Sequence, residues 1–178
     1  MGEDDDRTDT SEAAQPVRSQ QTVEFLRVVQ QHHIQLSSMA DFKANILMAA
    51  CVLLVSFNLR AFGDGLPPPA MLILLGGAVA AAVCALLAVM PATARRAGQA
   101  PNRLFFGGFA EMEEADYQAW MRGLLDDRVR LEEAMVRDIH QLGLVLARKK
   151  YLWLGRAYRL FLAGILGAAL VWAVDLLI

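Results

Sequence analysis

The chain has 178 residues, of which 56% are hydrophobic and 20% are charged, and its formal net charge is −2. That length leaves room for one soluble module and its membrane segments. Cys51 and Cys84 lie in apolar stretches without a second thiol or histidine at ligand spacing, which excludes a disulfide framework and a cysteine-based metal site. The apolar residues are gathered in three blocks, and this clustering predicts a membrane protein.

The N-terminal part of the chain divides into a tail and a helix. Residues 1–18 are acidic and poor in large apolar side chains, which predicts a disordered tail. Residues 19–43 carry apolar side chains at helical spacing, namely Phe25, Leu26, Val29, Leu36 and Met39. No proline or glycine separates this segment from the first apolar block, so we expect one long helix over roughly 23–59.

Three apolar stretches are long enough to cross a bilayer, and we expect transmembrane helices at 44–62, 70–91 and 160–178. About 20 apolar residues in a helix match a hydrocarbon thickness of about 30 Å. A helix also satisfies its own backbone groups in lipid. The segment between the first two spans is rich in proline and glycine, which predicts a short turn between antiparallel helices.

The second span carries two rows of small residues at a spacing of four. One row holds Gly76, Ala80, Cys84 and Ala88, and the other holds Gly77, Ala81 and Ala85. Small residues at this spacing let helix backbones approach closely in lipid. Two interpretations remain open for this helix-packing face: packing within one chain, or self-association into a homo-oligomer.

Residues 92–159 form the predicted soluble part. A loop or short broken element precedes a long helix from Glu111 to about Lys150, which we expect to continue into the third span. Its apolar stripe consists of Trp120, Leu124, Leu131, Met135, Ile139, Leu142 and Leu146. We expect this stripe to pack on the helix over residues 23–40. The fold class is therefore all-α, with three transmembrane helices and a cytosolic helical pair that is continuous with the spans.

Basic residues flank the second and third spans on the side of this soluble part. Arg95, Arg96 and Arg103 follow the second span, and the third is preceded by Arg148, Lys149, Lys150, Arg156 and Arg159. The positive-inside rule places the N-terminus and the central region in the cytosol.

No residue pattern indicates catalysis or a metal site, and we expect neither an enzyme nor a cofactor. The basic residues have two interpretations. They set topology and contact lipid headgroups, or they bind an anionic ligand such as a nucleotide, with cations for phosphate and an aromatic face for the base. The candidate ligand residues are Arg95, Arg96, Arg103, Arg148, Lys149, Lys150 and Tyr151.

Polar residues also mark the point where the first span begins: Asp41, Lys43 and Asn45. Asp41 and Asn45 are four apart and share a helix face. Polar groups at this depth face the bundle rather than lipid. Either they make a hydrogen-bonded contact to a neighbouring helix, or they act as a trigger at the membrane interface.

Three motifs resemble those of the Pycsar transmembrane effectors. ADFKANILMAA, from Ala40, is similar to the AD-x-KA-x-x-LL-x-A start of that family's first span. NRLFFGGFAEMEEADYQAW, from Asn102, resembles its FFG…eeY stretch, and LARKKYLWLGRAYRLF, from Leu146, matches the KY at the start of its last span. The resemblance runs from about Gln30 to the C-terminus. Gly108 departs from the pattern, which usually has an acidic residue after FFG.

This resemblance implies a bacterial antiphage effector. In such systems a linked pyrimidine nucleotide cyclase makes cyclic CMP or cyclic UMP on infection, and the effector responds at the inner membrane and impairs its integrity. The implied partners are membrane lipid and the cyclic nucleotide, and no nucleic acid. A different function fits the residues as well: a constitutive membrane scaffold or regulatory subunit that binds a protein partner through its cytosolic helices.

Overall fold

The computed structural model describes residues 7–60, 67–91 and 102–177. The chain divides into two compact units. Unit 1 comprises residues 1–34 and 93–143, and unit 2 comprises residues 35–92 and 144–178. Each unit is described separately below.

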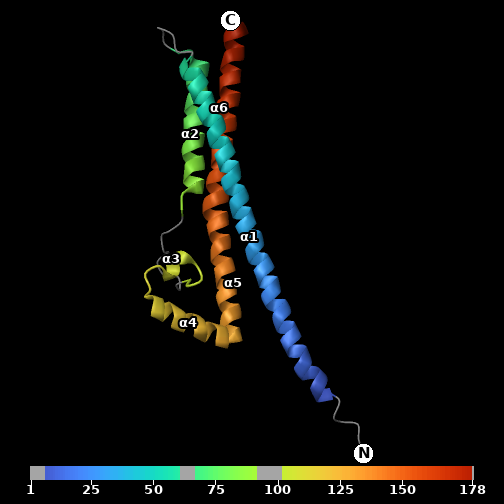
Figure 1. The fold of residues 1–178 in the computed structure, drawn as a ribbon. Coiled ribbons are helices and arrows are strands. Elements are labelled where there is room, and N and C mark those ends of the chain that lie inside the picture. The colour runs from blue at the N-terminus through green and yellow to red at the C-terminus, as the bar shows by residue number, and fades with distance from the viewer. Residues whose placement is uncertain (1–6, 61–66, 92–101, 178) are drawn as a thin grey trace, which may run out of the picture. The chain divides into compact units, whose positions relative to one another are not determined.

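The described residues form helices and no strand, which confirms the all-α prediction (Figure 1). The helices are α1 (Arg7–Arg60), α2 (Pro69–Val89), α3 (Phe106–Phe109), α4 (Glu114–Asp126), α5 (Arg128–Val145) and α6 (Leu152–Leu177), with a π-helical turn, η1 (Leu146–Tyr151), between α5 and α6. Helix continues from Arg128 to Leu177 without a break. The expectation that the helix before the third span runs on into it is therefore confirmed.

Among the described residues, three helical stretches are long and apolar enough to cross a membrane: Gln20–Arg60, Pro69–Val89 and Arg128–Leu177. Each covers most of one of the predicted spans, 44–62, 70–91 and 160–178. The single long first helix is also confirmed, but it begins at Arg7, where the sequence predicts a disordered tail to residue 18. Good helix formers at residues 12–15 favour this extension, and extending an existing helix requires no new nucleus, whereas Pro16 inside the extension opposes it.

The core of unit 2 is built mainly from small side chains on three helices. The buried residues are Ala40, Ala44, Leu47 and Cys51 of α1, Ala78, Ala81, Ala85 and Ala88 of α2, and Leu154 and Ala157 of α6. Alanines at helical spacing let the helices approach closely, as is usual for membrane helices. Figure 1 shows α2 and α6 lying along each other in this unit.

Two glycines mark the closest approach of α2 and α6. A Cβ atom built on Gly77 would lie 2.6 Å from Cα of Gly164, and one built on Gly164 would lie 2.9 Å from Cα of Gly77. Gly77 and the buried Ala81 thus pack within the chain, whereas Gly76 has no atom within 4 Å of such a Cβ and is exposed. Packing within one chain is the role of the Gly77 row, while self-association stays a prediction.

The prediction of one long helix from Glu111 to Lys150 is wrong, because the helix breaks at Asp127 into α4 and α5. Asp127 has extended backbone angles, φ −116° and ψ 102°. Its carbonyl oxygen accepts the N–H of Leu131, and its carboxylate accepts the N–H of Arg130 at 3.1 Å. Both bonds are those of a helix N-cap. In Figure 1, α4 turns away from α5 at this point.

Removing this cap is expected to loosen the start of α5. Asp127→Ala leaves the N–H of Arg130 without its acceptor and should lower the stability of the helix start by about 1 kcal/mol. Hydrogen exchange at residues 128–131 should speed up accordingly. Asp126→Ala, one residue earlier, removes the same charge without the cap and serves as the control; equal exchange in both variants would contradict the capping role.

The break also divides the predicted apolar stripe. Trp120 and Leu124 lie on α4, and the remaining members lie on α5 and η1. In unit 1, α1 and α5 are joined by a hydrogen bond from Gln30 to Asp138. The cytosolic helical pair, with the whole stripe packed on residues 23–40, stays a prediction.

Candidate functional site

The polar residues at the start of the first span meet the basic residues before the third. Within unit 2, Nζ of Lys150 lies 2.7 Å from Oδ1 and 2.6 Å from Oδ2 of Asp41, and 2.7 Å from Oγ of Ser37. The Lys150 side chain is 16% exposed and that of Asp41 is 35% exposed. The three hydrogens of the ammonium group are thus all donated to groups of the chain itself.

Neighbouring residues reinforce this contact. The hydroxyl of Tyr151 donates to the backbone oxygen of Leu36 at 3.4 Å, and Tyr158 donates to the backbone oxygen of Lys43 at 3.5 Å. Lys149 donates to the backbone oxygen of Pro91 at 3.1 Å. Lys150 and Tyr151 both lie in η1. Asp41 and Lys150 were both candidate site residues in the sequence analysis. The sequence did not predict that they form a pair.

In unit 1 a buried carboxylate joins three segments. Asp138 of α5 is 8% exposed. Its Oδ1 accepts from Nδ2 of Asn102 at 2.6 Å, and its Oδ2 accepts from Nε2 of Gln30 at 2.5 Å. The other side-chain atom of Asn102, Oδ1, accepts the N–H of Leu104 at 3.0 Å. Sequence reasoning missed this cluster, although an acid between Met135 and Leu142 in an apolar stripe was a usable signal.

The segment after Asn102 brings a cation and aromatic rings together. The guanidinium of Arg103 lies 5.7 Å from the ring centroid of Trp120. The ring centroid of Tyr117 lies 5.9 Å from that of Trp120 and 4.8 Å from that of Phe109. This set, which we call the Arg103 cluster, comprises Phe109, Tyr117, Trp120 and Arg103. It offers a cationic group beside aromatic faces, a combination suited to an anionic aromatic ligand.

The backbone around Gly108 explains why this position departs from the family pattern. A Cβ atom on Gly108 would lie 1.8 Å from the backbone oxygen of Asn102. No side chain fits there without moving the backbone, so an acidic residue at this position is incompatible with the turn that this chain forms.

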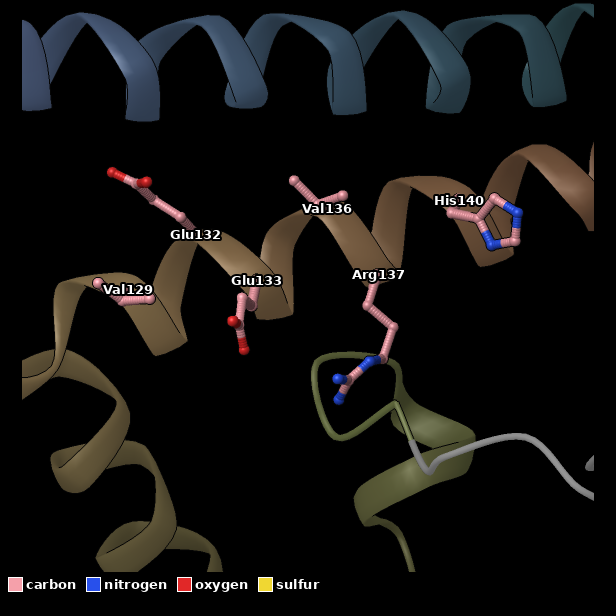
Figure 2. A pocket seen from close by; sticks show the side chains of 6 residues that line it. All are labelled: Val129, Glu132, Glu133, Val136, Arg137 and His140. Carbon is pink, nitrogen blue, oxygen red and sulfur yellow. The ribbon is translucent and has the colours of Figure 1, made fainter.

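Two of the other predicted ligand residues, Arg95 and Arg96, lie outside the described residues, and a third, Arg148, is exposed on η1. Asn45 is exposed on α1. A shallow hollow along α5 contains none of the predicted residues (Figure 2); it is lined by Val129, Glu132, Glu133, Val136, Arg137 and His140. Its two carboxylates oppose the binding of an anion. In the described part of the chain, no group of three His, Cys, Asp or Glu side chains could hold a metal ion.

These features define an α-helical membrane protein that carries a separate helical unit with a cation–aromatic surface. A family model described as the Pycsar effector protein domain matches residues 24–178. The chain belongs to the Pycsar effector family, which confirms the resemblance found in the sequence. No curated protein and no solved structure gives a significant match.

Family membership makes this chain a membrane effector of antiphage defence. It is the effector of a Pycsar system rather than the cyclase, and such a system implies a linked nucleotide cyclase and a cyclic pyrimidine signal.

Proposed function

We propose that this effector responds to a cyclic pyrimidine nucleotide, cyclic CMP or cyclic UMP, and then impairs the integrity of the bacterial inner membrane, causing abortive infection. The family match and the three membrane-length helices support this proposal. The flanking basic residues favour a topology in which the N-terminus and residues 92–159 are cytosolic, where a cyclase product would reach them.

The Arg103 cluster is the observation that carries the ligand part of the proposal. A 3′,5′-cyclic nucleotide has one anionic phosphodiester and one aromatic base. Guanidinium N–H groups suit phosphate oxygens, and aromatic side chains stack on bases. Both Arg103 and Trp120 are half-buried, so neither side chain is free to move as a surface lysine does. We propose that Arg103 meets the phosphate and that the aromatic rings face the base.

The remaining candidates take second place in this proposal. Lys149 and Lys150 already donate to groups within unit 2, so an anion would have to displace those contacts first. Arg95, Arg96, Arg148 and Tyr151 remain candidates for additional contacts with the ligand or with lipid headgroups. Gly76 and Ala80, on the other small-residue row of α2, remain candidates for a homo-oligomer contact in the active state.

The ligand is expected to stabilise the protein against heat. For the full chain in nanodiscs, a ligand at about 100 times its dissociation constant raises the free energy of unfolding by about 2.7 kcal/mol. We expect a shift in melting temperature with cyclic CMP or cyclic UMP and none with cyclic AMP or cyclic GMP.

The matched variants test the cluster. Arg103→Ala and Trp120→Ala should lose the shift, and Arg122→Ala, which removes an exposed arginine of α4, should keep it. If Arg103→Ala keeps the shift in melting temperature, the ligand binds at another site. If no cyclic nucleotide shifts the melting temperature, the response to such ligands is refuted and a scaffold that binds a protein partner becomes the better interpretation.

A further inference from the structure

The contact between Asp41 and Lys150 lies beside the junctions of the two units in the sequence. The division between the units falls after Ile34 on α1 and after Gly143 at the end of α5. Ser37 and Asp41 follow the first junction within about two turns, and Lys150 follows the second at a similar distance. Any displacement that travels along either helix toward the spans therefore passes these residues.

The π turn adds a second, independent observation. A π-helix bonds each N–H to the carbonyl five residues earlier; it is rare, occurs mostly as a single turn inside an α-helix, and is frequent at functional sites. Here η1 holds two residues that reach α1, Lys150 through Asp41 and Ser37, and Tyr151 through the backbone of Leu36. Since side chains on an α-helix advance by about 100° per residue, return of η1 to α-helix would turn Lys150 away from Asp41.

The energetics of such a pair suit a contact that breaks on activation better than a permanent structural contact. Replacing a partly buried ion pair by apolar residues is often neutral for stability, whereas removing one partner leaves an uncompensated charge. A paired ammonium and carboxylate are therefore stable together and unfavourable apart unless both reach water or headgroups. Such a contact is either made or broken, and a two-state equilibrium needs two such states.

We propose that the contact of Lys150 with Asp41 and Ser37 is a lock that holds the membrane helices in their resting arrangement, and that activation breaks it. The lock keeps η1 in its π geometry and fixes α1 against the start of α6. When it opens, η1 relaxes toward α-helix, and α6 rotates about its axis relative to α5. The proposal rests on the effector function for its readout, and it is independent of which ligand activates the protein.

The test uses full-length protein in liposomes that contain a self-quenched dye, together with growth of cells that lack the linked cyclase. Asp41→Asn and Lys150→Met should each raise leakage in the absence of any cyclic nucleotide by about tenfold, because loss of the lock shifts a resting equilibrium whose open state is a minor population. The charge-exchanged double variant, Asp41→Lys with Lys150→Asp, should return leakage toward the original value.

Two controls separate the lock from simple damage. Arg159→Met removes an exposed positive charge of α6 and should leak no more than the unmodified protein. Lys150→Arg keeps the charge and should also show no more leakage than the unmodified protein. A circular dichroism spectrum and a gel-filtration profile in detergent show whether each variant is folded; if one of Asp41→Asn and Lys150→Met misfolds, the other decides the matter, because each breaks the same ion pair.

The possible results are distinct. Leakage from the single variants with rescue by the charge exchange supports the lock, even if no cyclic nucleotide activates the unmodified protein, in which case the ligand proposal alone fails. Single variants that stay closed while a cyclic nucleotide still opens the unmodified protein overturn the lock and leave the proposed function intact. Single variants that no longer open with ligand also overturn it, because the pair would then belong to the active state.

Discussion

Gly77→Leu is expected to prevent the membrane helices from packing. The new side chain would start 2.6 Å from Cα of Gly164, and backbone cannot yield as a flexible side chain does. We expect the cost to exceed about 3 kcal/mol, the upper part of the range for overpacked interiors. Thermal unfolding of the purified protein in nanodiscs measures the effect. Gly164→Leu should behave in the same way, since the contact is reciprocal.

The neighbouring glycine provides a matched control. A Cβ atom on Gly76 meets nothing within 4 Å, and the residue is exposed on α2. Gly76→Leu adds the same apolar side chain one residue away, where lipid accommodates it, and should change stability by no more than about 0.5 kcal/mol. Equal destabilisation by the two variants would mean that α2 and α6 do not meet at Gly77.

Asp138→Leu is expected to unfold the segment that carries the Arg103 cluster. The change leaves the amide groups of Gln30 and Asn102 without their acceptor in a buried site. Each unsatisfied donor costs about 1–3 kcal/mol, so the two together should lower the stability of unit 1 by about 2–6 kcal/mol. Hydrogen exchange should accelerate at residues 102–109 and 135–143 and remain slow in α2.

Asp138→Asn is the conservative partner of this change. The asparagine keeps the shape and one carbonyl oxygen, so it can satisfy one of the two amides and should cost clearly less. Asp126→Asn, an exposed acid at the end of α4, controls for the loss of charge. If Asp138→Leu left the exchange of residues 102–109 unchanged, Asp138 would not be what holds that segment in place.

The features predicted correctly from the sequence are those that depend on local composition. Three apolar stretches of membrane length predict three membrane-length helices, because the bilayer sets the length that a helix needs. The absence of breakers between residues 23 and 59 predicts a single α1. The close packing of Gly77 follows in the same way from small residues at helical spacing.

The features that were missed depend on contacts between distant segments. Asp41 and Lys150 are 109 residues apart, and each had a sufficient local explanation, as a polar residue at the membrane edge and as a charge that sets topology. The break at Asp127 was not predicted, because aspartate is common on helix surfaces and becomes an N-cap only when its backbone is extended. The role of Asp138 required knowing that Gln30 and Asn102 lie beside it.

The π turn has a consequence for how this family can diverge. A π turn holds about one residue more than the α-helical turn it replaces, so loss of one residue from η1 would leave the later positions of α6 facing as they do now. Loss of a residue between Leu152 and Gly164 would instead rotate the later positions by about 100°, and Gly164 would then no longer face Gly77. Substitutions are therefore far better tolerated than insertions or deletions between Leu152 and Gly164. When relatives of this chain are aligned, we expect the number of residues in that interval to vary less than their identities.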